Sequence, residues 1–178
     1  YDRQEIYEGT LDSVQDRLAA EESSLMSTDN ILQRVRELAV AASSDTMSQD
    51  DRKIVAIEIN ALTDSLLAHA NTQDVNGNYI FAGSAVSTVP FSLDAEGDIR
   101  YRGDNSYVAV DVSEQQRLNM NRPGNEVFDG VVRHSTDGTG SSKISFFKVI
   151  TDFSSALMSN DTGAIQRSLG EVDDLSAT

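Results

Sequence analysis

The stretch Leu11–Ala42, LDSVQDRLAAEESSLMSTDNILQRVRELAVAA, determines the architecture that the rest of the chain has to complement. Its seam positions recur at intervals of three and four residues, which predicts one stripe along an α-helix that packs as in a coiled coil. No proline or glycine interrupts it. We expect a helix from near Tyr1 to near Ser43, about 60 Å long at 1.5 Å per residue. The seam residues are Leu11, Val14, Leu18, Glu21, Leu25, Thr28, Leu32, Val35, Ala39 and Ala42.

A second helix is indicated after the polar break that follows Ala42. Ser48 and Asp51 have the spacing of a weak capping box, and acidic residues at this end complement the helix dipole. We expect this helix to run from about Ser48 to Ala70. Its broad apolar face is typical of a helix that packs on two neighbours. The residues expected to pack are Val55, Ile59, Leu62 and Leu66.

Helical spacing returns near the C-terminus. One helix is predicted from Phe146 to Leu157, and a second, capped by Asn160 or Asp161, continues to Leu175. Packed antiparallel to the first helix, these segments would place Leu175 beside its first turns. Because neither end of the sequence carries a clear cap or stop signal, we expect a fragment cut within helices. The packing residues here are Ile165, Leu169 and Val172.

Between the helical regions the composition shifts to Val, Tyr, Gly, Asn and Pro. Strands are predicted at 89–93 and 99–102, which flank a turn, and at 107–112, 117–121 and 126–128. Short strands with polar alternate faces predict a small antiparallel sheet or barrel.

The fold class that follows is α+β, with a long-helix antiparallel bundle stem and an inserted small antiparallel β-domain. We expect residues 1–83 and 141–178 to form the helical stem domain, which is discontinuous in sequence. Residues 84–140 would form the β-rich inserted domain.

The charge balance excludes several functions. The net charge of −15 provides no basic patch for nucleic acid or for an anionic membrane. The chain has no cysteine, so a disulfide framework and a thiolate metal site are excluded. We find neither an apolar run near 18 residues nor a signal peptide, so the address of an exported protein would lie outside these residues or would not be of the cleaved secretory kind.

Catalytic and metal sites are poorly supported, and we predict a non-enzymatic protein without cofactors. His69 lies near the end of the second helix and His134 in a polar loop beside Ser135, but a triad depends on fold geometry rather than on sequence adjacency. The loop that begins at Asp74 starts like a calcium loop but lacks the later glutamate. The alternating acids of residues 94–98 fit a solvated turn.

The most specific motif follows the second helix. The run Asn71–Gly83, NTQDVNGNYIFAG, contains an Asn-Gly turn and a predicted strand at Tyr79–Ala82, and Pro90-Phe91 follows. We call it the junction motif, because it would lie between stem and insert. Its selected residues are Asn71, Asn76, Gly77, Tyr79, Phe81, Gly83, Pro90 and Phe91.

The junction motif, together with QRVRELAVAA at residues 33–42, resembles the flagellar hook-associated protein 3 family, the hook–filament junction proteins related to flagellin. The helical run alone would not separate this family from flagellin. One position departs from the family pattern, because Asn78 stands where a basic residue is expected.

This resemblance implies a structural subunit of the bacterial flagellum that forms the junction ring between hook and filament and serves motility. It implies self-assembly into a ring, contact with the first hook–filament junction protein and with flagellin, and an export chaperone. It also implies an extracellular location reached by type III export without a cleaved signal peptide. The alternatives are a flagellin-type filament subunit, or a secreted adhesin-like binding module that uses the β-insert.

Overall fold

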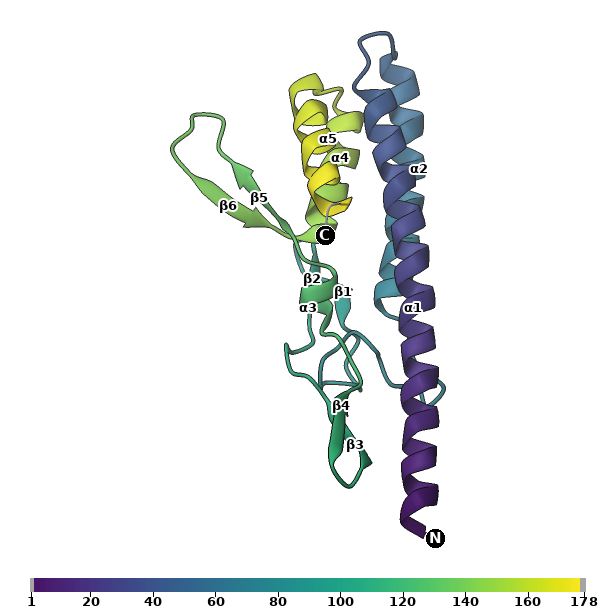
Figure 1. The fold of residues 1–178 in the computed structure, drawn as a ribbon. Coiled ribbons are helices and arrows are strands. Elements are labelled where there is room, and N and C mark those ends of the chain that lie inside the picture. Colours follow the sequence, from purple (N-terminus) through teal and green to yellow (C-terminus); the bar gives the residue numbers. More distant parts are fainter. Residues whose placement is uncertain (1, 177–178) are drawn as a thin grey trace. The chain divides into compact units, whose positions relative to one another are not determined.

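The computed structural model describes residues 2–176, so Tyr1, Ala177 and Thr178, which the predicted stem includes, lie outside the described residues. The fold is α+β, as predicted, and Figure 1 shows its elements. In chain order they are α1 (Asp2–Ala42), α2 (Gln49–Ala70), β1 (Phe91–Leu93), β2 (Ile99–Tyr101), β3 (Ala109–Ser113), β4 (Gln116–Asn119), α3 (Gly124–Val127), β5 (Val131–His134), β6 (Ser141–Ile144), α4 (Phe146–Met158) and α5 (Thr162–Ser176).

The chain forms two compact units. Unit 1 comprises Tyr1–Met26 and Ala68–Val127, and unit 2 comprises Ser27–Leu67 and Phe128–Thr178. Both boundaries in the first half of the chain fall inside long helices. These units are defined by contacts within the chain, and the division into a stem (1–83 and 141–178) and a β-rich insert (84–140) stays a prediction.

The long first helix is confirmed. In unit 2, α1 buries Leu32, Val35, Leu38, Ala39 and Ala42. From α2, Val55, Ile59 and Leu66 are buried, which gives the antiparallel pair an apolar interior. On the outside, Arg34 of α1 pairs with Glu58 of α2 at 2.7 Å.

One buried arginine joins the two turns of unit 2. Arg52 donates to the Ala42 carbonyl at 3.1 Å and to the Ser44 carbonyl at 2.9 Å, which satisfies groups at the C-terminal end of α1. Its third contact, at 2.8 Å, is to the side-chain oxygen of Asn160 in the turn between α4 and α5. Because Asn160 adopts φ 55°, this turn has the left-handed conformation that asparagine tolerates.

Both C-terminal helices begin at side-chain caps, and the cap of α5, Asp161, is one of the two predicted residues. Ser145 accepts from the Lys148 amide at the start of α4, and Asp161 accepts from the Ala164 amide at the start of α5. The expected position of Leu175 is wrong, however. Asp173 pairs with Arg36 at 2.6 Å, so α5 lies along the last part of α1 in unit 2 and not along its first turns.

The β-region forms three separate two-stranded antiparallel hairpins, β1–β2, β3–β4 and β5–β6, rather than one sheet or barrel. All four residues of β4 are exposed, and Val112 of β3 is the buried residue of this hairpin. The strand predicted at 126–128 is also wrong. Pro123 accepts from the amides of Glu126 and Val127 and starts the short helix α3 there.

The hairpin β5–β6 was not predicted, because the two adjacent valines of β5, Val131 and Val132, and the mostly polar β6 show no apolar–polar alternation in sequence. It also places His134 in a strand instead of a loop. Ion pairs hold it within unit 2. Arg133 contacts the Glu171 carboxylate through two nitrogens, at 2.7 and 2.8 Å, and the Asp152 carboxylate at 2.8 Å. These acceptors raise the pKa of Arg133, with Glu171 contributing most.

Two leucines on the same predicted seam provide a matched test of this packing. Leu32 is 6% exposed, whereas Leu18 is 45% exposed. We expect Leu32→Ala to lower the free energy of unfolding by about 2–5 kcal/mol, because it leaves a cavity. Leu18→Ala should cost less than about 1 kcal/mol. Urea denaturation of the two variants measures the difference, and equal losses would contradict the observed packing.

Candidate functional site

The junction motif begins with Asn71, whose side chain makes two hydrogen bonds to the backbone of Phe91. The Asn71 side-chain amide donates to the Phe91 carbonyl at 2.9 Å, and its oxygen accepts from the Phe91 amide at 2.9 Å. A side chain thus supplies the pair of hydrogen bonds that a neighbouring β-strand would make. This contact ties the end of α2 to the start of β1 within unit 1.

Asp74 organises the turn predicted at Asn76-Gly77. One carboxylate oxygen accepts from the amides of Asn76 and Asn78, at 2.9 and 3.0 Å. The Asp74 carbonyl accepts from Gly77, whose φ of 80° requires the left-handed region. The turn is therefore an Asx turn, and its side-chain hydrogen bonds are internal to the loop.

The same turn occurs again between β1 and β2. Asp94 accepts from the amides of Glu96 and Asp98 at 3.0 and 2.9 Å, and Gly97 adopts φ 85°. The two turns differ in the cation that faces the free carboxylate oxygen. Asp94 pairs with the exposed Arg100, which lowers the pKa of the Asp94 carboxyl, whereas Asp74 faces the buried Arg17 of α1.

The segment Phe81–Gly83 is buried and is not the strand predicted at Tyr79–Ala82. Ile80, Phe81 and Ala82 are all buried, without the alternation of a half-covered strand. Their backbone groups bond to scattered partners: the Phe81 carbonyl accepts from Gly124 at 2.9 Å, and the Ala82 carbonyl accepts from Asp104 at 3.1 Å. These hydrogen bonds hold the segment as an irregular buried loop and do not form the regular pairing of a β-strand.

Gly83 is required at its position by two constraints. Its φ is 67°, and a Cβ there would lie 2.1 Å from an Asp104 carboxylate oxygen. That carboxylate accepts from the Ser84 hydroxyl and from the amides of Ser84 and Ser106. These donors, the Ser84 hydroxyl first, lower the pKa of Asp104. The motif is therefore held by residues well beyond it in sequence.

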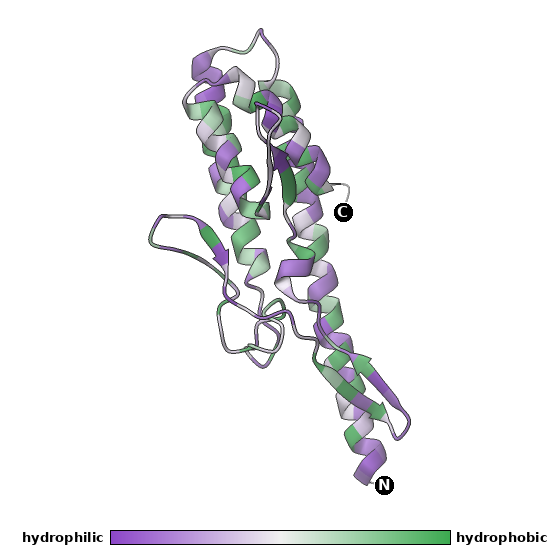
Figure 2. Cartoon of the chain, turned by 90° about the vertical axis from the view of Figure 1, so that its left-hand side faces the viewer, coloured by the Kyte–Doolittle hydropathy of each residue, from purple (hydrophilic) through white to green (hydrophobic). Residues whose placement is uncertain are grey.

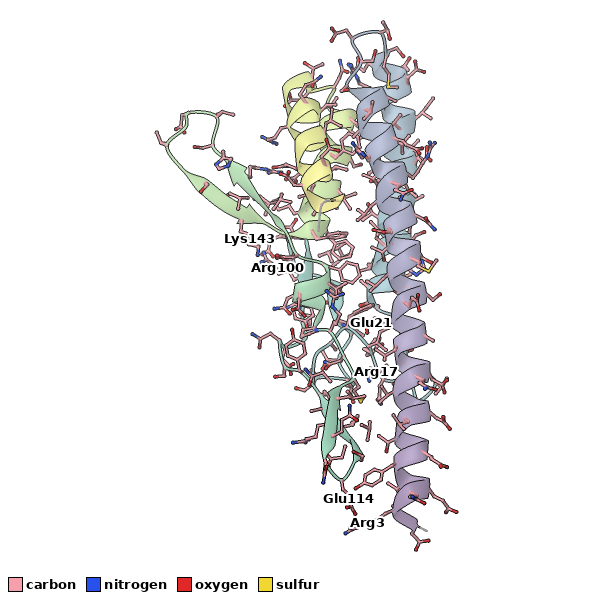
Figure 3. The ribbon with its side chains drawn as sticks, in the orientation of Figure 1. Arg3, Arg17, Glu21, Arg100, Glu114 and Lys143 are labelled. Atoms are coloured by element: carbon pink, nitrogen blue, oxygen red, sulfur yellow. The ribbon has the colours of Figure 1, made fainter. Side chains whose placement is uncertain are left out.

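The first half of α1 presents polar groups to this segment. Arg17 is 2% exposed, and its guanidinium lies 3.5 Å from the Asp74 carboxylate and 3.4 Å from the Tyr79 carbonyl. The Ser24 hydroxyl donates to the His69 carbonyl at 2.8 Å. Glu21, one turn after Arg17, is 7% exposed, and both side chains project from one side of α1 (Figure 3). Burial raises the pKa of the Glu21 carboxyl, although Arg122 and Arg17 oppose this shift.

The structure distributes the predicted packing residues unevenly. Leu25, Leu62 and Leu169 are half-buried. Leu11 and Leu18 are 37% and 45% exposed, so they lie outside the buried surface of α1. Hydrophilic and hydrophobic residues are interleaved along the helices in Figure 2. The predicted packing residues that the structure buries are Val14, Leu32, Val35, Val55, Ile59, Leu66, Ile165 and Val172.

Within residues 2–176, no group of three or more His, Cys, Asp or Glu is placed to hold a metal ion. The Ser135 hydroxyl donates to Asp137 at 2.6 Å in the β5–β6 turn, and this bond contributes most to lowering the pKa of Asp137 to about 2. An open cleft of about 460 Å³ beside this turn is lined by Arg133, His134 and Arg167 among others. In the described part of the chain no helix is both long and apolar enough for a membrane span.

Sequence reasoning missed the residues that act at a distance. Arg17, Asp104 and Gly124 all support the junction motif, but none lies within it. From sequence alone, an arginine within a helix is expected to be exposed to solvent, because its neighbours in space are not known. Glu21 on the predicted seam was the available signal, because a charged residue at a seam position indicates a polar environment beside that part of the helix.

Comparison with known proteins confirms the resemblance. Residues 2–86 match the sequence family described as the bacterial flagellin N-terminal helical region. Flagellar hook-associated protein 3 of Escherichia coli (strain K12) is 35% identical over 128 residues, which are 70% of this chain and 39% of that protein. The chain therefore spans less than half the length of this relative.

Solved structures share the fold. Xanthomonas campestris FlgL matches with a TM-score of 0.86 at 22% identity, over 99% of this chain and 88% of that chain. The flagellar junction protein FlgL from Legionella pneumophila matches with a TM-score of 0.76 at 18% identity, over 99% and 93% of the two chains.

Substitution of the two glycines with positive φ in the junction motif distinguishes the cost of backbone strain from the cost of steric crowding. A Cβ at Gly77 meets nothing within 4 Å, whereas one at Gly83 meets Asp104. We expect Gly77→Ala to cost roughly 1–2 kcal/mol from the left-handed conformation alone. Gly83→Ala should cost about 1–3 kcal/mol more because of overpacking. Thermal or urea unfolding compares them, and equal losses would show that Asp104 moves freely.

The raised pKa of Glu21 predicts a pH dependence. An acid whose pKa is raised by folding contributes stability that is fully present below its unfolded pKa and is lost as the pH rises through the folded value. Glu21→Gln cannot titrate, so the wild type should gain stability relative to this variant as the pH falls from about 7 to about 4.

Urea unfolding of both proteins at each pH measures this difference. Glu22→Gln is the matched control, because the neighbouring Glu22 side chain is exposed. Parallel stability curves for the wild type and Glu21→Gln would contradict the prediction.

Proposed function

We propose that this chain is part of a non-enzymatic structural subunit of the bacterial flagellum, located at the junction between hook and filament. The observation that carries the proposal is the 35% identity over 128 residues to the Escherichia coli hook-associated protein 3, a stretch longer than the flagellin-type match at 2–86. The fold shared with FlgL structures over 99% of the chain is consistent with it.

The physical properties of the chain suit such a subunit. A continuous helix of 41 residues provides a stiff element that can transmit load along an assembly. The net charge of −15 disfavours binding to nucleic acid and to anionic membranes. We propose that the whole protein assembles with copies of itself, with the first hook–filament junction protein and with flagellin. It would reach the cell exterior by the flagellar export route with the help of a chaperone.

Gene deletion and immunogold labelling test this function in the bacterium that encodes the chain. Deletion should leave hooks without filaments and release flagellin into the medium, because the filament has no junction to grow from. Antibodies against this chain should label one narrow band at the hook–filament boundary. Restoring the full-length gene is the control and should restore filaments.

The rivals give different outcomes in the same experiment. Labelling along the whole filament would identify a filament subunit, the reading favoured by the flagellin-type match at 2–86. Normal filaments after deletion, with label elsewhere on the cell, would favour a secreted adhesin-like module. Either result would overturn the junction assignment.

A further inference from the structure

The two halves of α1 are held by different kinds of contact. Between residues 2 and 26 the buried side chains are Val14, Arg17, Glu21 and Ser24, of which one is apolar. Between residues 27 and 42, Thr28 is the polar exception among buried Leu, Val and Ala side chains. Burial of a Leu or Val side chain contributes about 1.5–3 kcal/mol, so the first half has much less apolar stabilisation.

Arg17 is incompletely paired where it is buried. Its Nε and Nη1 atoms make no hydrogen bond to any protein acceptor, and the Nη2 contact with Tyr79 is long at 3.4 Å. The Nη1–Asp74 separation of 3.5 Å leaves an ion pair without a hydrogen bond. Burial accordingly lowers the pKa of Arg17, while Asp74 and Glu21 act in the opposite direction. A buried ion pair of poor geometry does not recover its desolvation cost.

The other contacts of this half do not compensate. Arg3 pairs with Glu114 at 3.2 Å, but their side chains are 80% and 71% exposed, and such pairs contribute little. Leu11 and Leu18 are mainly exposed rather than packed. Ser24 supplies one good hydrogen bond, to the His69 carbonyl. The contact of residues 2–26 with the segment 69–80 is therefore largely polar.

We propose that the Arg17–Glu21–Asp74 cluster is a built-in release point of the long helix. Residues 14–24 separate from the segment 69–80 of their own unit as one step, while residues 32–42 stay packed in unit 2. The first half of α1 is thereby able to exchange neighbours without unfolding the apolar core of unit 2. The inference goes beyond the proposed junction function and does not depend on it.

Native-state hydrogen exchange with mass spectrometry tests the release in the wild-type chain, because residues 14–24 lose the packing that keeps their helical hydrogen bonds closed once they leave the segment 69–80. We expect the amides of residues 14–24 to exchange at least about tenfold faster than those of 32–42, which corresponds to about 1.4 kcal/mol. They should also share one opening rate. A smooth gradient from the N-terminus would indicate simple fraying, and equal protection of both segments would overturn the proposal.

A charge-free variant tests the role of the cluster. Arg17→Leu/Glu21→Leu/Asp74→Asn removes all three charges, and the new asparagine can still accept the Asx-turn bonds. Apolar replacement of a poorly compensated ion cluster favours packing, so exchange of 14–24 should slow at least tenfold, with 32–42 unchanged. Arg17→Leu alone should accelerate it, because Asp74 loses the cation that faces it and the buried Glu21 loses one of its two cations.

The second copy of the turn supplies the control. Asp94→Asn/Arg100→Leu removes the same kind of pair where the arginine side chain is 60% exposed, and exchange of 14–24 should not change. Unchanged or faster exchange of 14–24 in the charge-free variant would overturn the role of the cluster. If that variant does not fold, the proposal is contradicted as well, because removal of the charges would then be destabilising.

Discussion

The structure depends on one constraint, which is that other segments of the chain must pack against the long helix α1. α1 has 41 residues, and a helix of this length gains most of its stability from packing rather than from propensity. In unit 2 the buried residues of α1 are mainly apolar, and α2 and α5 both contact the last part of this helix. In unit 1 the covering is an irregular loop segment, so the helix presents groups that bond to backbone carbonyls and to a turn.

The four long helices could be predicted from sequence to within a residue or two because their signals are local, whereas the short helix α3 was expected to be a strand. Caps at Ser48 and Asp161 predicted where α2 and α5 begin, and apolar spacing predicted the extents of α1 and α4. The hairpins β1–β2 and β3–β4 were predictable for the same reason, since a turn and its flanking strands lie together in the chain. Their arrangement was not, because the separation into three hairpins depends on which faces stay exposed.

The junction motif shows the limit of local reasoning most clearly. The Asn-Gly turn and the need for Gly77 could be read from the residues themselves. The requirement for Gly83 comes from Asp104, and the burial of Arg17 comes from a loop more than fifty residues away. The misplacement of Leu175 has a similar origin, because helical period gives length and face but not the register between two helices. The functional proposal therefore stands on similarity to relatives rather than on that register.

Arg52 has a consequence for how the two connections that it contacts in this chain can vary in length. A single guanidinium reaches the loop after α1 and the loop before α5, so the lengths of two connections far apart in the gene are tied to each other. Surface loops usually accept insertions at low entropic cost. Here a longer loop on either side would move the oxygen that accepts from Arg52 away from the guanidinium. A change of length in one connection would therefore have to be accompanied by a change in the other.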